Sequence, residues 1–201
     1  MKKRILIINT GGTLSSVNGE NGLMPGMKSR DMLDELRMVS RNLELETEDF
    51  CSVDSANIFP EDWARLAELI AKRSRDYQGI AVIHGTDTLA YTASMLSFML
   101  QNISIPVVVT GSQLSIADPV ADAMENCRCG IHMAAGGCPG VFVAFNRKVI
   151  LGCRVLTHLK ALIILILVKS VLWDFISAGK TLWKKEESSV LRQPIQTRYF
   201  C

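Results

Sequence analysis

At 201 residues the chain is long enough for one substantial hydrophobic core, and its 22 basic and 20 acidic residues give a formal net charge of +2. This charge leaves no electrostatic footprint for nucleic acid or a membrane surface, so we expect a small neutral or zwitterionic ligand. The six cysteines form no Cys-x-x-Cys pair and there are only three histidines, which predicts reduced thiols in a cytoplasmic protein and no metal site.

The first predicted element is a buried strand, Ile5-Leu6-Ile7-Ile8, which leads into Asn9-Thr10-Gly11-Gly12-Thr13-Leu14. The apolar run stops after four residues and has no small-residue cleavage site, so we do not interpret it as a signal peptide. The glycine pair permits a tight turn and the close approach of a ligand, which the hydroxyl of Thr13 would face. Such a turn on its own is more often a strand-to-helix connection without chemistry.

The elements that follow alternate between helix and strand. Residues 15–27 are polar and glycine-rich, which predicts a mobile loop and a candidate lid. Apolar spacing then predicts a helix capped by Ser29 with its apolar face at Met32, Leu33, Leu36 and Val39, and a half-buried strand from Leu43 that leads into 53–57.

Three further strands and three helices complete the prediction. Pro60 opens a helix with Trp63, Leu66, Ala67 and Ile70 on one face, and residues 89–100 are apolar enough to be buried on most of their surface. The third helix begins at Asp118-Pro119 and ends at about Ala135. The strands are 80–83, 107–109 and 141–145.

This alternation predicts an α/β fold: a mostly parallel sheet with helices on both faces. In such a sheet a ligand binds at the carboxyl ends of the strands, where the strand order reverses. Four stretches rich in small and hydroxyl residues follow predicted strands. They are 10–13, 54–57, 84–88 and 110–113. We therefore expect one ligand to contact several of them.

The residue types in these stretches suit amide chemistry on an amino acid. A threonine on a glycine turn becomes a nucleophile if a base takes its proton and backbone amides stabilise the oxyanion. Carboxylates at Asp54 and Asp87 suit an ammonium group, and Ser55 suits a carboxylate. Asp54 and Ser55 are more often a turn or cap, and His84 is more often a satisfied core histidine.

Two motifs together carry a family resemblance. Thr10-Gly11-Gly12-Thr13-Leu14 with His84-Gly85-Thr86-Asp87-Thr88 resembles the paired signatures of the bacterial L-asparaginases, most closely the cytoplasmic type I branch. The supporting stretches are Asp54-Ser55, Pro60-Glu61-Asp62-Trp63, Tyr91-Thr92-Ala93-Ser94, Ser97-Phe98-Met99-Leu100 and Thr110-Gly111-Ser112-Gln113. The similarity runs from about residue 3 to residue 154.

The resemblance implies the roles of the site residues. Thr13 is the nucleophile on the side-chain amide of L-asparagine, and Thr86 and Asp87 form the second catalytic cluster, with Asp87 meeting the substrate's amino group. Asp54 and Ser55 bind the substrate's backbone groups. The reaction releases ammonia and L-aspartate without a metal or organic cofactor. The partner is a small-molecule substrate, with no nucleic acid or membrane, and the full-length family forms homo-oligomers.

The chain departs from the family pattern at two proton-transfer positions. Leu23 stands where some members place a loop tyrosine, and other members use a tyrosine of the second domain. The family places a lysine shortly after a Gly-x-Arg stretch. Here Gly152-Cys153-Arg154 is followed by Val155-Leu156-Thr157, and Lys160 lies further on.

The resemblance stops at about residue 155, which predicts two segments. Residues 1–155 form the amino-terminal catalytic domain, 156–201 form an aberrant tail, and the second domain is missing. With suitable codons, residues 161–166 read one base earlier become Ser-Phe-Asp-Asn-Phe-Asp, which resembles the family's sequence after its lysine. A frameshift near residue 156 is the simplest explanation, and it predicts impaired catalysis.

Two alternatives stay open. The chain is an amidase for another amide, such as glutamine or the amide of a misacylated transfer RNA, although the near-neutral charge argues against the latter. Otherwise it is a non-catalytic domain that at most binds an amino acid. Measurement of ammonia release separates these alternatives.

Overall fold

A computed structural model describes residues 2–11, 16–19, 22–25, 34, 36–37, 40–113, 122–156 and 173–174. A seven-stranded sheet runs through it in the order β4-β1-β5-β6-β7-β8-β9. The strands are β4 (Leu43–Val53), β1 (Lys3–Gly11), β5 (Gly79–Ile83), β6 (Pro106–Thr110), β7 (Gly140–Phe145), β8 (Lys148–Leu151) and β9 (Trp173–Asp174). The first five are parallel, and β8 and β9 are antiparallel to their neighbours.

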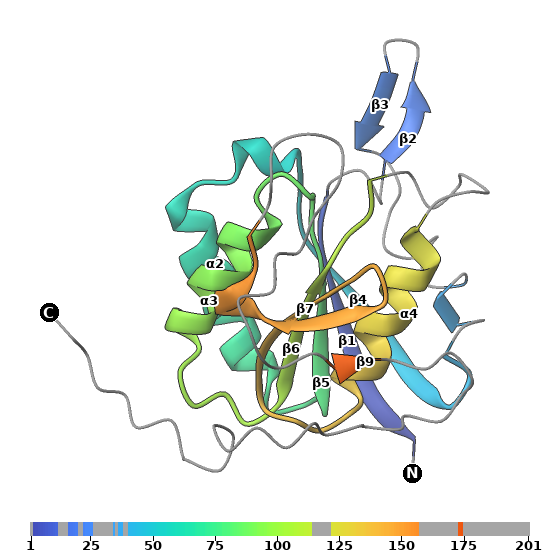
Figure 1. Cartoon of the computed structure of the whole chain (residues 1–201), viewed down its shortest axis with the longest axis vertical. Helices are drawn as coiled ribbons and strands as arrows, with labels where there is room; N and C mark the ends of the chain where they lie inside the picture. Colours follow the sequence, from blue (N-terminus) through green and yellow to red (C-terminus); the bar gives the residue numbers. More distant parts are fainter. Residues whose placement is uncertain are drawn as a thin grey trace, which may run out of the picture.

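Helices cover both faces of the sheet (Figure 1). α2 (Pro60–Arg73) and α3 (Leu89–Met99) lie on one face, and α4 (Ala123–Ala134) lies on the other. Each face has its own core: Leu66, Leu96 and Val109 belong to the first, and Ile7, Val108 and Ile131 to the second. The predicted α/β fold with a mostly parallel sheet is confirmed.

The central strands form where the sequence has continuous apolar runs. β5 and β6 are buried at every residue, as expected for parallel strands that helices cover on both faces. α2 begins where Pro60 occupies its first turn and the Asp62 carboxylate accepts the Phe59 N–H at 3.1 Å. Lys72 and Arg73 place positive charge in its last turn, where it interacts favourably with the negative end of the helix dipole.

Two predictions of secondary structure were wrong. Residues predicted as a loop contain a two-stranded antiparallel sheet, β2 (Ser16–Gly19) and β3 (Gly22–Pro25). The helix over 89–100 is present as α3, but its outer face is not buried, since Tyr91 is 62% exposed and Phe98 is 65% exposed.

Parts of two other predicted helices lie outside the described residues. Of the helix predicted after Ser29, the structure describes Asp34, Leu36 and Arg37 as helical, and Leu36 is buried. Asp118-Pro119 is also outside the described residues. The helix predicted from there is seen from Ala123 onward as α4.

The sheet continues past the predicted domain limit at residue 155. Trp173–Asp174 pairs with Lys148 and Val149 as β9 at the edge of the sheet. The rest of residues 157–201 lies outside the described part of the chain. The division at residue 155 therefore stays a prediction.

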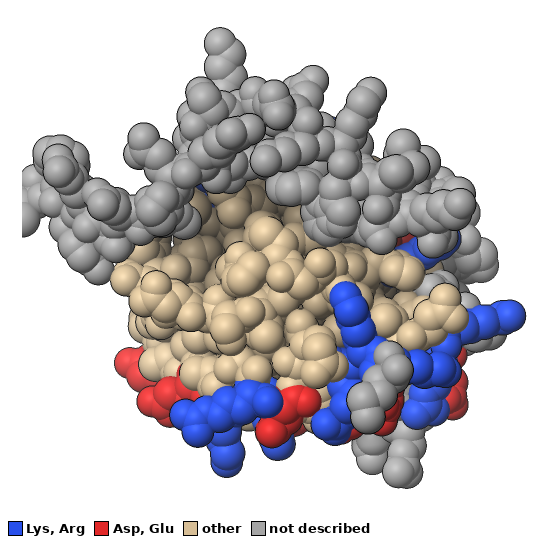
Figure 2. Space-filling view, turned by 90° about the horizontal axis from the view of Figure 1, so that it is seen from below, with Lys and Arg blue, Asp and Glu red and all other residues tan. Residues whose placement is uncertain are grey.

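Figure 2 shows the end of the molecule at which β1 begins. Uncharged residues occupy the centre of this face, and basic and acidic side chains lie side by side along its lower edge. Ion pairs join such groups in the first strands and α2: Arg4 to Glu46 at 2.6 Å and Arg73 to Glu48 at 2.8 Å. Mixed charge of this kind gives no one-sided basic surface for a polyanion.

Candidate active site

The order of the sheet strands reverses at β1. The chain passes from β1 to β4 on one side, then crosses to β5 on the other side of β1. β1 and β5 are parallel and Asn9 pairs with Ile83, so both strands end at the same edge of the sheet. A switch of this kind opens a crevice at the carboxyl ends of the two strands. In the sequence Thr13 comes two residues after the end of β1, and the loop over 84–88 follows β5.

Side chains of β1 hold the start of its turn. The Thr10 hydroxyl donates to the Ile83 carbonyl at 2.9 Å. The Asn9 side chain accepts the Gly11 N–H and donates to Asp49, both at 3.1 Å. Gly11 has a φ of +95°, and a Cβ there would lie 2.6 Å from the Val53 carbonyl oxygen, so only glycine fits. Thr13 itself lies outside the described residues.

The loop after β5 contacts the stretch after β4. A Cβ at Gly85 would lie 2.5 Å from the Ser55 side chain, so the two segments meet without space between them. The Thr88 hydroxyl donates to the Ser55 carbonyl at 2.8 Å. Ser55 is buried, Thr86 is half-buried and Asp87 is exposed. The structure therefore brings the 54–57 and 84–88 stretches together.

Asp54 takes part in a local cap. Its carboxylate accepts the Ala56 N–H at 2.9 Å at the start of the short 3-10 turn Ser55–Asn57. This is the turn role that aspartate commonly has in such a position. Asp54 thereby fixes the backbone that carries Ser55, and whether it also contacts a ligand stays a prediction.

His84 is the satisfied core histidine that the sequence favours. It is fully buried, its backbone N–H donates to the Thr110 carbonyl at 2.8 Å, and both ring nitrogens have partners. Burial lowers the pKa of His84 to about 4, against a smaller opposing effect from the Gly85 carbonyl. The ring is therefore neutral near pH 7. Sequence reasoning did not find its side-chain partner Thr92, or Trp63, whose indole N–H donates to the Thr92 hydroxyl.

The 110–113 stretch joins the same edge through a second polar network. Asn126 of α4 is fully buried, and its amide donates to the Gly111 carbonyl at 3.0 Å and to Asp122 at 2.8 Å. Ser112 donates to the other oxygen of the Asp122 carboxylate. Gln113 is exposed. These contacts fix the turn after β6, and no sequence motif pointed to Asn126.

Cys51, near the carboxyl end of β4, is a free thiol. The Cys51 thiol donates to the Thr10 carbonyl at 3.2 Å, and burial raises its pKa to about 11. A thiolate nucleophile at this position is thus disfavoured. Within the described ranges, no three or more His, Cys, Asp or Glu side chains are placed to hold a metal ion.

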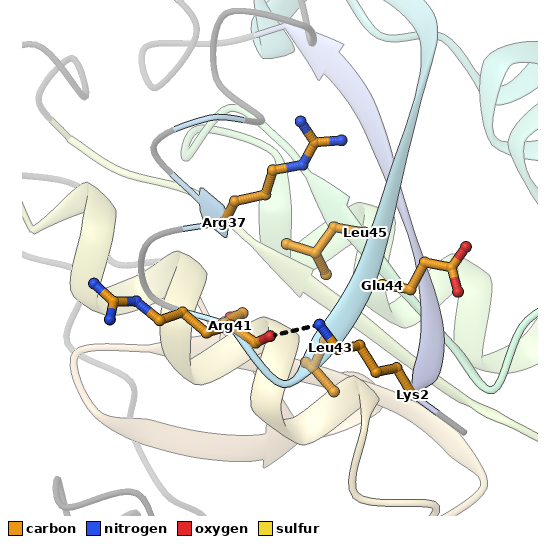
Figure 3. A pocket seen from close by; sticks show the side chains of 7 residues that line it. Lys2, Arg37, Arg41, Leu43, Glu44 and Leu45 are labelled. Carbon is orange, nitrogen blue, oxygen red and sulfur yellow. Dashed lines mark hydrogen bonds between the residues drawn. The ribbon is translucent and has the colours of Figure 1, made fainter.

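A pocket of about 380 Å³ lies at the opposite end of the sheet, where β1 and β4 begin (Figure 3). Arg37, Leu45 and Glu44 are among its lining residues, and the Lys2 ammonium donates to the Arg41 carbonyl at 3.2 Å. The charged ends of Arg37, Arg41 and Glu44 point in different directions. Because it lies where β1 and β4 begin, this pocket is separate from the candidate site at the carboxyl ends of the strands.

Among the helices in the described part of the chain, none has the length and apolar character needed to span a membrane.

Known proteins resemble this chain in sequence and fold. An L-asparaginase of Thermococcus kodakarensis is 43% identical over 154 residues, covering 76% of this chain and 47% of the relative. The solved thermostable L-asparaginase from Thermococcus kodakarensis superposes with a TM-score of 0.81 at 36% identity, covering 92% of this chain and 57% of that one. The chain thus spans about half the length of the relatives that it matches.

A second kind of relative has a different name. A protein of Thermoplasma acidophilum, named as one of the subunits of a glutamyl-tRNA(Gln) amidotransferase, is 32% identical over 133 residues, covering 66% of this chain and 32% of the relative. The family model described as "Asparaginase, N-terminal" matches residues 4–160. On the fold, the strand-end motifs and this match, the chain belongs to the asparaginase family.

Proposed function

We propose that this chain supplies the amino-terminal half of an L-asparaginase, which hydrolyses L-asparagine to L-aspartate and ammonia through Thr13. The observation that carries the proposal is the adjacency of β1 and β5 at the reversal of strand order. Thr13 follows β1 in the sequence, and the loop with Thr86 and Asp87 follows β5. Relatives named L-asparaginase support the same function.

The proposed roles follow from charge and burial. Asp87 is an exposed carboxylate at the strand ends, suited to the ammonium group of a free amino acid. Ser55, next to Gly85, offers a hydroxyl to the carboxylate of the substrate, and the Asp54 cap fixes the turn behind Ser55. Thr86 belongs to the second catalytic cluster that the family resemblance implies.

The proposed chemistry is acyl transfer to threonine. The Thr13 hydroxyl loses its proton and its oxygen attacks the side-chain amide carbon, and the C–N bond then breaks so that ammonia leaves with an added proton. Water hydrolyses the resulting ester, which returns Thr13 and gives L-aspartate. Each step needs a proton acceptor and an oxyanion stabilised by backbone amides.

We expect this chain to hydrolyse L-asparagine slowly. Leu23 stands where some family members have a tyrosine, and Val155-Leu156-Thr157 follows the Gly-x-Arg stretch in place of a lysine. Loss of a positioned acid or base lowers a rate by roughly 10²–10⁴-fold. A frameshift near residue 156 is our proposal for the second difference, and resequencing of the coding DNA over codons 150–165 tests it.

Ammonia release from L-asparagine by the purified chain tests the function. Thr13→Val tests the nucleophile, and Thr47→Val, in the middle of β4, is the matched control. We expect turnover far below the ~10 per second of a typical enzyme, abolished by Thr13→Val and unchanged by Thr47→Val. Turnover near ~10 per second refutes the impairment. Residual hydrolysis that survives Thr13→Val refutes the nucleophile.

A second candidate is an amidase for another amide, because one relative carries the name of an amidotransferase. Parallel assays with L-glutamine and with a misacylated transfer RNA decide between them. The net charge of +2 favours the free amino acid over a polyanion.

We also propose a cytoplasmic location, reaction without a cofactor, and assembly into homo-oligomers when the chain is joined to the rest of a full-length family member. Absence of ammonia release together with retained binding of L-aspartate favours the non-catalytic alternative.

A further inference from the structure

Three side chains from separate elements form one chain of hydrogen bonds beside the loop after β5. The Trp63 indole N–H of α2 donates to the Thr92 hydroxyl oxygen of α3 at 2.8 Å. The same oxygen lies 2.9 Å from Nε2 of His84, and Nδ1 of His84 lies 2.8 Å from the Gly85 carbonyl oxygen. Thr92 and His84 are fully buried. None of these three residues has a role in the proposed acyl transfer.

The partners allow one tautomer of the histidine ring. The Gly85 carbonyl can only accept, so Nδ1 of His84 must carry the proton. Nε2 is then an acceptor, and the Thr92 hydroxyl donates a hydrogen bond to it. The Thr92 oxygen in turn accepts from Trp63, which can only donate. Every donor in the chain then has an acceptor, and the opposite tautomer would set two acceptors, Nδ1 and the Gly85 oxygen, face to face.

The chain of bonds fixes the orientation of one peptide unit. The Gly85 carbonyl is held toward the buried ring of His84. The described part of the chain has no cis peptide bonds, and in a trans peptide the carbonyl and the following N–H point in opposite directions. The Thr86 N–H therefore points away from His84. The hydrogen bond to His84 thus fixes the plane of the Gly85–Thr86 peptide, from which the backbone leads to Thr86 and Asp87.

We propose that Trp63, Thr92 and His84 are positioning residues that hold the Gly85–Thr86 peptide and thereby the amino-acid site at Thr86 and Asp87. We call this chain of hydrogen bonds the relay. The inference rests on the proposed function, because the relay is expected to affect how tightly the amino acid binds at that site. Close packing supports it, because a Cβ added at Gly85 would lie 2.5 Å from the Ser55 side chain. Because burial lowers the pKa of His84, the ring stays neutral near pH 7 and its two partners select the tautomer.

The test uses the full 201-residue chain and two measurements. Long-range ¹H–¹⁵N spectra report the tautomer of His84 and backbone spectra report the Thr86 amide shift, while calorimetry gives the affinity for L-aspartate. The variants are Thr92→Val, which removes the hydroxyl at constant shape, and Thr92→Ser, which keeps it. Ser97→Ala is the matched control, since Ser97 lies on the same helix and its hydroxyl donates to the Ala93 carbonyl of that helix at 2.7 Å.

We expect the Nδ1–H tautomer in the parent chain. Thr92→Val should change the His84 ring signals, shift the Thr86 amide and weaken L-aspartate binding about tenfold, the scale of one lost buried hydrogen bond. Thr92→Ser should restore all three readouts, and Ser97→Ala should leave them unchanged. If Thr92→Val does not fold, Trp63→Phe removes the other donor and should shift the same signals.

An Nε2–H tautomer in the parent chain overturns the relay. So does a folded Thr92→Val chain with an unchanged Thr86 amide shift and unchanged affinity. Failure of the parent chain to bind L-aspartate counts against the proposed function instead, and the tautomer and the Thr86 shift then still decide whether the relay sets the peptide.

Discussion

The hydroxyl of Thr10 donates to the carbonyl of Ile83 and so joins β1 to β5 at the reversal of strand order. Thr10 is 1% exposed, so water does not replace this bond when it is lost. Thr110 of β6 repeats the arrangement two strands along the sheet, where its hydroxyl donates to the Ala144 carbonyl of β7 at 2.8 Å. Threonine side chains thus continue the strand-to-strand contacts at the carboxyl edge.

Thr10→Val should lower the free energy of unfolding by about 1–3 kcal/mol, because it removes the donor and leaves a buried carbonyl with one partner fewer. Thr10→Ser keeps the hydroxyl and should lose less. Urea denaturation at pH 7 measures both variants. A Thr10→Val chain as stable as the parent would show that this bond does not stabilise the edge.

Gly85→Ala should destabilise the chain and weaken L-aspartate binding, because the new methyl would lie 2.5 Å from the Ser55 side chain. Overpacking of this kind costs about 1–3 kcal/mol. Gly137→Ala is the control, since its Cβ meets nothing within 4 Å and only its φ of +81° opposes the change. We expect the control to lose stability without losing affinity. Equal affinity in both variants would contradict the close contact of these loops.

The fold followed from the sequence where local pattern decides it. Unbroken apolar runs such as 80–83 placed the parallel strands, and Pro60 placed the start of α2. The order of the strands was not accessible, because it depends on contacts between distant segments. The outer face of α3 misled the prediction, since exposed Tyr91 and Phe98 have the same apolar character as core residues.

Two hairpins were missed for local reasons. β8 follows a turn at Asn146 and Arg147, both with positive φ of 48° and 60°, and arginine gives no signal for that conformation. β2 and β3 lie in a glycine-rich stretch whose composition favours a loop, although Gly19 of β2 pairs with Gly22 of β3. In the site, the sequence identified the motifs but not the hydrogen bonds around His84, because Thr92 meets His84, and Trp63 meets Thr92, only after the helices pack.

Stability should fall at both extremes of pH through Glu46 and Tyr77. The Tyr77 hydroxyl, which donates to the Glu46 carboxylate at 2.6 Å, and Arg4 lower the pKa of Glu46. The stability that Glu46 contributes is therefore present above the ordinary pKa of a glutamate, and it is lost as the pH falls through the lowered pKa. Burial, with the Glu46 contact, raises the pKa of Tyr77 to about 12. That contribution is complete below the ordinary tyrosine pKa of 10 and is lost as the pH rises toward 12.

Tyr77→Phe removes the hydrogen bond between Tyr77 and Glu46. The free energy of unfolding should then change less with pH in both the acidic and the alkaline range. Urea denaturation across the acidic and alkaline ranges measures the profile. Identical profiles for the parent and Tyr77→Phe chains would contradict this account.

Deletion of residues 156–201 should leave the domain folded and more soluble, because the apolar run at 162–168 has no strand-type alternation and favours association. Among the described residues, deletion removes the pairing of Trp173–Asp174 with β8. Limited proteolysis of the parent chain should cut first beyond residue 155. A protected segment whose deletion unfolds the domain would show that it belongs to the native sheet.

The most direct test of the central claim is a ¹H–¹⁵N titration of the chain with L-aspartate. If the amino-acid site lies at the carboxyl ends of β1 and β5, the backbone amides of Ser55, Thr86 and Asp87 should shift with one common Kd, and those of Leu43 and Leu45 at the opposite end should not. Shifts confined to the Leu43 and Leu45 region, or no saturable shift at Thr86 and Asp87, would contradict it.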